Sequence, residues 1–175
     1  LATPSGDPIG LLGLYVFLLI PFAMTGALAL AWVILVERRP LSTIGLTSSG
    51  ASSFLRGLGI GVATIGAVVA AIWATGAYHA DGFGRAFSAP RDVIAIAILI
   101  PCFVVQAGVE EIIFRGYLLQ TLGGWRGWWP GVIASSILFG LAHALNPNVT
   151  ALSLANIALA GVVFCLTYRI TRRLW

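Results

Sequence analysis

Residues 93–122 read VIAIAILIPCFVVQAGVEEIIFRGYLLQTL, a long run that is apolar apart from a few polar residues in its second half. A helix needs about 20 mainly apolar residues to cross a bilayer, and this run is longer than that. The stretch therefore predicts a membrane-spanning helix. Pro101 has no amide hydrogen, so we expect it to bend this helix or to mark a break within it.

The composition extends this prediction to the whole chain. Of 175 residues, 59% are apolar and 9% are charged, whereas soluble domains have about 25% charged residues. A soluble globule is excluded, and inside lipid the backbone must be satisfied by helices or a closed barrel. Long apolar runs favour helices, so we expect an all-α, polytopic transmembrane helix bundle with about five spans. Residues 1–175 would form a single membrane domain, with apolar helices at 9–36, 54–77, 93–122, 129–145 and 151–169.

The charged residues indicate how the chain lies in the membrane. The net charge of +4 comes from ten arginines and six acids, without any lysine, and the arginines are scattered between apolar runs. This pattern argues against nucleic acid as a partner. Residues 37–50 predict a polar loop at the membrane surface. If the N-terminus lies outside, eight arginines fall on the cytoplasmic side and only Arg85 and Arg91 fall outside, as the positive-inside rule favours.

Three ionisable residues stand inside the third predicted span. Glu111 and Arg115 are four residues apart, so they lie on one face of a helix in the favourable order for an ion pair. Glu110 is rotated by about 140° from Arg115 and needs another partner. An unpaired carboxylate in an apolar site has a raised pKa, which suits a general base.

His143 is the one histidine inside a predicted span, and we expect it to meet Glu110. Phe139 precedes it by one turn and could separate such a site from lipid. A structural alternative is that these polar residues only lock two helices together. Two carboxylates with one arginine leave net negative charge, which favours function over a purely structural ion pair. A straight helix entering at Val93 would put Glu110 and His143 at different depths, unless the embedded part is nearer 97–117 or the helix bends at Pro101.

The sequence EEIIFRGYL at 110–118, followed by LFGLAHALNP at 138–147, resembles the first and second motifs of the CAAX protease and bacteriocin-processing family, also called the Abi family of intramembrane endopeptidases. The resemblance covers roughly residues 90–175. It implies a type II CAAX prenyl-protease architecture in which Glu110 and His143 activate a water that attacks a peptide carbonyl. Glu111 and Arg115 would support the site.

The resemblance also implies a peptide or protein substrate at the membrane, lipidated or not, and a bacterial inner membrane as the location. The spacing of the acids and the arginine is not the His-Glu-xx-His of zinc peptidases, which bind zinc through three protein ligands. We therefore expect no metal and no other cofactor. Asn146 either lines the site or, with Pro147, ends the helix.

Family members usually carry a third motif, a histidine followed four residues later by an asparagine, which is thought to stabilise the oxyanion. The chain has only His79 and His143, and His79 lies in an expected outer loop. Loss of one oxyanion donor lowers rates by about 10²–10³-fold. We therefore expect the chain to continue beyond Trp175 into that helix, and to be weakly active as it stands.

Two other functions stay open. A noncatalytic membrane interaction protein, such as a bacteriocin self-immunity factor, would keep the scaffold and bind a partner. A proton-coupled transporter with Glu110 and His143 as a relay ranks lower, because inverted repeats and paired broken helices are not visible in the sequence.

Overall fold

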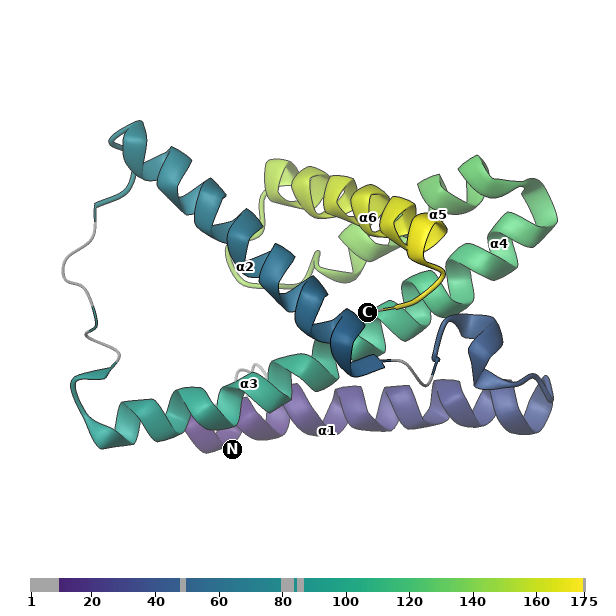
Figure 1. Cartoon of the computed structure of the whole chain (residues 1–175), viewed down its shortest axis with the longest axis horizontal. Coiled ribbons are helices and arrows are strands. Elements are labelled where there is room, and N and C mark those ends of the chain that lie inside the picture. The colour runs from purple at the N-terminus through teal and green to yellow at the C-terminus, as the bar shows by residue number, and fades with distance from the viewer. Residues whose placement is uncertain (1–9, 48–49, 80–83, 85–86, 175) are drawn as a thin grey trace. The chain divides into compact units, whose positions relative to one another are not determined.

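The computed structural model of the protein describes residues 10–47, 50–79, 84 and 87–174. Within these ranges the regular structure is helical throughout, which confirms the all-α prediction (Figure 1). In chain order the elements are α1 (Gly10–Ala31), the π-helix η1 (Trp32–Val36), the 3-10 helix η2 (Leu41–Ile44), α2 (Gly50–Ala74), α3 (Pro90–Glu111), the π-helix η4 (Ile112–Leu118), α4 (Leu119–Arg126), α5 (Trp128–Ala142) and α6 (Ala151–Thr171).

Pro21 and Pro101, which lie within the first and third predicted spans, do not break their helices. Helix α1 runs through Pro21 and α3 runs through Pro101. Helix α3 continues into η4 and α4, so that one candidate span extends over Pro90–Arg126. At about 1.5 Å per residue, its 37 residues reach roughly 55 Å, which exceeds the hydrocarbon thickness of about 30 Å. Part of this helix must therefore lie outside the bilayer core.

Among the residues that the structure describes, four helices are long and apolar enough to cross a membrane, which indicates an integral membrane protein. They are Gly10–Val36, Ala51–Ala74, Pro90–Arg126 and Ala151–Thr171. The fourth predicted span, 129–145, is the shorter α5, whose 15 residues reach only about 22 Å. It ends at Ala142 because a turn begins at His143, where φ is −94° and ψ is 1°.

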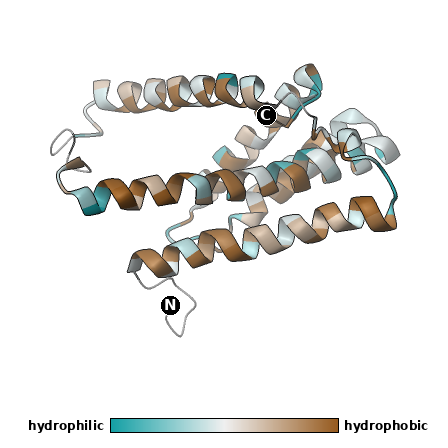
Figure 2. Cartoon of the chain, turned by 60° about the horizontal axis from the view of Figure 1, so that its bottom comes forward, coloured by the Kyte–Doolittle hydropathy of each residue, from teal (hydrophilic) through white to brown (hydrophobic). Residues whose placement is uncertain are grey.

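The exposed surface explains why this composition requires lipid. Large apolar side chains are exposed along the spans, for example Leu28 at 70% and Ile170 at 84%. Figure 2 shows hydrophobic residues along the lengths of the helices, with hydrophilic residues gathered mainly near helix ends and in connections. Such large exposed apolar surfaces are unfavourable in water and favourable against acyl chains.

The chain divides into two compact units. Unit 1 contains Leu1–Thr47 and Ile100–Leu174, and unit 2 contains Ser48–Leu99. In unit 1, α4 packs against α5 and α5 against α6. Small residues make these contacts close: a Cβ at Gly131 would lie 2.8 Å from the Gly123 backbone, and one at Gly161 would lie 3.1 Å from Ser136. Small residues let helices approach closely in lipid.

The segment after η1 is not only the surface loop that the sequence predicts. It forms η2, and the side chain of Ile44 is fully buried against η4. A Cβ at Gly116 would lie 2.9 Å from the Ile44 carbonyl oxygen, so the glycine permits this approach. The prediction of a surface loop missed this contact because the sequence around Ile44 is polar. The apolar surface of η4 that buries Ile44 is distant in sequence and is present only in the folded unit.

We expect Gly131→Ala to destabilise unit 1 by about 1–3 kcal/mol, because the new methyl group meets the backbone of α4 rather than a movable side chain. Thermal unfolding of the purified protein in detergent would measure the loss. Gly124→Ala is the matched control, since nothing lies within 4 Å of a Cβ there. The control should gain about 0.5–1 kcal/mol from its higher helix propensity. Equal stability of the two variants would contradict the close packing.

Candidate active site

The π-helix η4 follows directly after the two glutamates of α3. Short π-helical segments are frequent at functional sites. The Phe114 carbonyl accepts a hydrogen bond from the Leu119 amide and another, of 2.7 Å, from Ser135 Oγ of α5. Gln120 Nε2 donates to the Gly116 carbonyl and to the Tyr168 hydroxyl of α6. Polar side chains thus tie this part of the long helix to α5 and α6.

Arg115 is the centre of the candidate site. Its side chain is 0% exposed, and its Nη1 lies 2.9 Å from Oε1 of Glu111, which confirms the ion pair that the spacing predicts. The guanidinium lies over the rings of Phe139 and Phe164, at 4.2 and 4.8 Å from their centroids. Arg115 was one of the eight arginines assigned to the cytoplasmic side by the positive-inside rule. Because its side chain is buried, it should not be counted among the charges of the loops.

Phe139 connects the two predicted motifs. Its ring is buried and contacts the rings of Phe114 and His143 edge-on, at centroid distances of 5.2 and 5.0 Å. The ring of Phe164 of α6 also lies edge-on to the ring of Phe139. The sequence analysis did not identify Phe164. Phe164 lies in an apolar helix without any polar neighbour in sequence, so no local signal marks it.

The helical hairpin between α4 and α5 determines which residues of its two arms lie opposite one another. Its turn is Gly127, whose φ of 95° favours glycine. Arg115 precedes Gly127 by 12 residues and Phe139 follows it by 12, and the two side chains are in contact. Glu111 and His143 each stand 16 residues from Gly127. Glu111 and His143 are therefore equally far from this turn in sequence, and the relative depth of Glu110 and His143 in a membrane stays a prediction.

His143 lies at the end of α5 and is partly exposed. Its Nδ1 is 2.8 Å from the Phe139 carbonyl oxygen. A carbonyl oxygen can only accept, so Nδ1 carries the hydrogen and Nε2 of the neutral ring keeps its lone pair. The ring thus presents an acceptor nitrogen for a water or a substrate proton.

Glu110 has a different partner from the expected one. Its Oε1 accepts a 3.2 Å hydrogen bond from Gln106 Nε2, one turn earlier on α3. Within the described part of the chain, no hydrogen bond or ion pair joins Glu110 to His143. The spacing of four between Gln106 and Glu110 is a signal that could have identified this contact.

Asn146 belongs to the turn after α5. Its amide donates to the His143 carbonyl at 3.1 Å, and its side chain is exposed. This geometry fits the helix-stop interpretation. Across the described ranges, no group of three or more His, Cys, Asp or Glu side chains could hold a metal ion.

Comparison with known proteins agrees with this arrangement. Residues 92–175 match the family model described as type II CAAX prenyl endopeptidase, Rce1-like. This segment of the chain is similar to that family. No curated protein and no solved structure matches the chain. The Rce1-like segment contains every residue of the candidate site, from Gln106 to Phe164.

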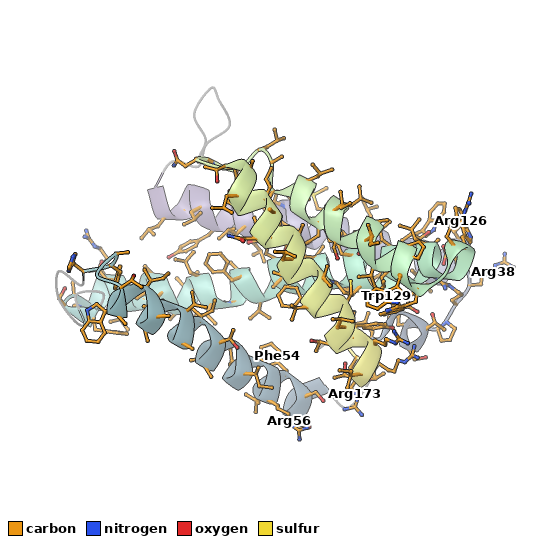
Figure 3. The ribbon with its side chains drawn as sticks, turned by 90° about the horizontal axis from the view of Figure 1, so that it is seen from above. Arg38, Phe54, Arg56, Arg126, Trp129 and Arg173 are labelled. Carbon is orange, nitrogen blue, oxygen red and sulfur yellow. The ribbon has the colours of Figure 1, made fainter. Side chains whose placement is uncertain are left out.

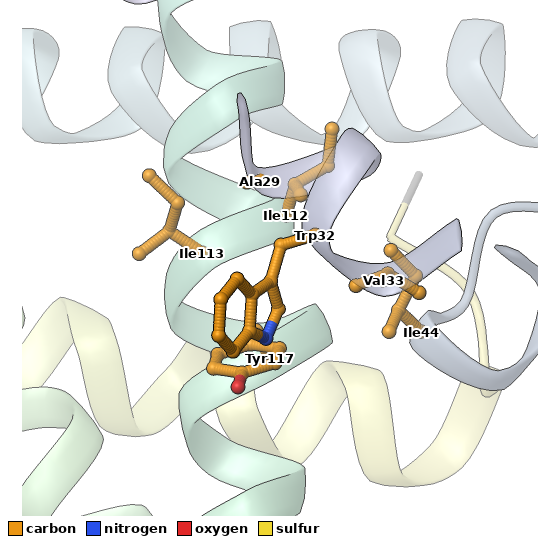
Figure 4. Close-up of a pocket in the computed structure, with 7 residues that line it drawn as sticks. All are labelled: Ala29, Trp32, Val33, Ile44, Ile112, Ile113 and Tyr117. Carbon is orange, nitrogen blue, oxygen red and sulfur yellow. The ribbon is translucent and has the colours of Figure 1, made fainter. Parts of the chain in front are cut away.

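An apolar pocket of about 220 Å³ lies next to η1 and η4 (Figure 4). Its lining is apolar apart from one ring hydroxyl and one indole nitrogen, and consists of Ala29, Trp32, Val33, Ile44, Ile112, Ile113 and Tyr117. The Tyr117 hydroxyl and Trp32 Nε1 both donate to Oε1 of Glu37, at 2.8 and 3.1 Å. The pocket therefore offers no free catalytic group, and its polar edge fastens η1 to η4.

We expect Glu111→Gln to destabilise the protein by about 3 kcal/mol, because it leaves the buried Arg115 charge without a counter-charge. This figure is at the lower end for a buried pair, since the Glu111 side chain is 24% exposed. Unfolding in detergent would measure it.

The double variant Glu111→Gln with Arg115→Met is the control for that effect. Removal of both charges should recover part of the lost stability, because no unpaired charge stays buried. Additive losses from the two substitutions would contradict a coupled ion pair.

Acid should weaken the attachment of η1 to η4. The Tyr117 hydrogen bond lowers the pKa of Glu37 below its ordinary value of 4.5. A lowered folded-state pKa contributes stability above the unfolded value, and this stability is lost as pH falls through the folded value. We expect the unfolding temperature to decrease when the pH is lowered below about 4.5. The decrease should be smaller in Tyr117→Phe. Identical acid profiles of the two proteins would be the contrary result.

Proposed function

We propose that the chain is an intramembrane endopeptidase that hydrolyses a peptide bond near the membrane, with water activated by Glu110 and His143. The match of residues 92–175 to the Rce1-like family model supports a peptidase and a peptide substrate. The proposal includes substrates with lipidated ends, a bacterial inner membrane and an N-terminus outside.

Phe139 carries the proposal. Its ring touches both Arg115 and His143, and its carbonyl fixes the His143 ring. A buried ion pair alone could be structural, but here the same phenylalanine also orients a partly exposed imidazole. The two motifs therefore form one cluster, in which Glu111 and His143 are equally far from Gly127 in sequence.

We assign general base hydrolysis to these groups. Glu110 takes one proton from a water whose other contact is His143 Nε2, and the water oxygen bonds to the peptide carbonyl carbon. When the carbon–nitrogen bond breaks, the same proton passes to the leaving amine, directly or through Nε2. Gln106 holds the Glu110 carboxylate, and the Arg115–Glu111 pair holds Phe139 and with it the imidazole.

One observation favours a second candidate, a noncatalytic membrane interaction or immunity protein on the same scaffold. Glu110 bonds to Gln106, and among the described contacts it does not bond to His143. Catalytic hydrogen bonds often tighten only when substrate is bound, so this geometry is compatible with both functions.

We expect Glu110→Gln to lower kcat by about 10²–10⁴-fold, because the amide keeps an acceptor for Gln106 but cannot take a proton. His143→Ala should have an effect of similar size. The assay is cleavage of a quenched fluorescent peptide with a farnesylated CAAX end, in proteoliposomes that contain the chain.

Glu37→Gln is the matched control, since this carboxylate bonds to Tyr117 and lies outside the cluster. Its rate should stay within about two-fold of the unaltered chain, which is the scatter expected for a site without contact to the chemistry. Full activity of Glu110→Gln would contradict the proposal. Absence of cleavage by the unaltered chain, with or without the farnesyl group, would favour the noncatalytic function.

A further inference from the structure

One end of unit 1 collects basic and aromatic side chains. In Figure 3, Arg38, Arg126 and Trp129 lie at the same end, where η1 ends and where α4 turns into α5. The end of α6 reaches the same region, because the Arg169 guanidinium lies 5.1 Å from the Trp128 ring centroid and the Leu174 amide bonds to the Gly45 carbonyl. We name as the basic end the residues Arg38, Arg126, Arg169 and Arg172 with Trp125, Trp128 and Trp129.

The basic end has uncompensated positive charge. In the described ranges, Arg38, Arg126 and Arg172 form no ion pair. The neighbouring Arg39 is paired with Glu37 at 2.6 Å and adds no net charge. Two tryptophans of this end are exposed, Trp125 at 77% and Trp129 at 57%.

Two of these arginines have a backbone that disfavours them. Arg38 and Arg172 have φ values of 54° and 57°, in the left-handed region. Arg172 is the C-cap of α6, a kind of position where glycine is preferred. Apart from glycines, the other described residue with positive φ is Asn148, a type that tolerates this conformation. Glycine would therefore be less strained than arginine at both positions.

We propose that the basic end binds the phosphate headgroups of anionic phospholipids. Guanidinium groups donate paired hydrogen bonds to phosphate oxygens, and tryptophan favours the headgroup layer of a bilayer. The dipoles of α4 and α6 also favour Arg126 and Arg172 at the C-terminal ends of these helices, so it is the exposed Trp125 and Trp129 at this end that point to headgroups. This inference does not depend on peptidase activity.

The test is lipid binding to the purified protein, measured by native mass spectrometry with phosphatidylglycerol and phosphatidylcholine of matched acyl chains. Phosphatidylglycerol should bind more tightly. The variant Arg38→Gly with Arg172→Gly should weaken its binding by roughly five-fold for each arginine, as expected from the contribution of one basic residue near an anionic surface. Its unfolding temperature should be unchanged or higher, because glycine removes the backbone strain.

Three further variants make the result decisive. Arg126→Gln, on ordinary helical backbone, should weaken phosphatidylglycerol binding by about five-fold, and this variant replaces the glycine pair if that pair fails to fold. Arg38→Lys should retain binding within about two-fold, because the charge is kept. Arg91→Gln should have no effect, because this exposed arginine lies beside Asp92. Equal affinity for both lipids, or unchanged affinity in the glycine and glutamine variants, would overturn the proposal.

Discussion

The buried charge of Arg115 is the constraint on which the rest of unit 1 depends. A guanidinium without contact to water loses a large solvation energy, and one carboxylate beside it does not restore all of that energy. The rings of Phe139 and Phe164 supply further electrostatic attraction from two other helices. Helices α5 and α6 are therefore held at η4 by an interaction that apolar packing alone does not provide, because lipid tails are as apolar as the side chains.

The backbone of η4 adds a second constraint of the same kind. In a π-helix the hydrogen-bond pattern shifts, and here the carbonyls of Phe114 and Gly116 also accept bonds from side chains. Ser135 and Gln120 supply those bonds, and Gln120 extends the connection to Tyr168. Close approach is possible because glycines stand where the helices meet. Charge, backbone polarity and small residues thus favour one packing of α5 and α6 against η4.

The sequence predicts what local geometry determines. Composition and run length predict an all-α membrane protein, and a spacing of four predicts the Glu111–Arg115 pair. The family resemblance over roughly residues 90–175 is confirmed by the match to residues 92–175. Phe164 and Ile44 were missed because both matter only through neighbours far away in sequence. The contact of Glu110 with Gln106 was missed although their spacing of four marks it, and the pairing of Glu110 with His143 stays a prediction.

The position of Gly127 relates the candidate site to the basic end. Gly127 follows Arg126 directly and so belongs to the end of unit 1 where the arginines and tryptophans gather. Glu111 and His143 stand 16 residues from it on the two arms of the hairpin, which is about 24 Å along each helix. If headgroups hold the basic end, the glutamates and the histidine lie well inside a hydrocarbon layer of about 30 Å. At that depth bulk water is absent, so the contacts of Glu110 with Gln106 and of His143 with the Phe139 carbonyl hold the two side chains in its place.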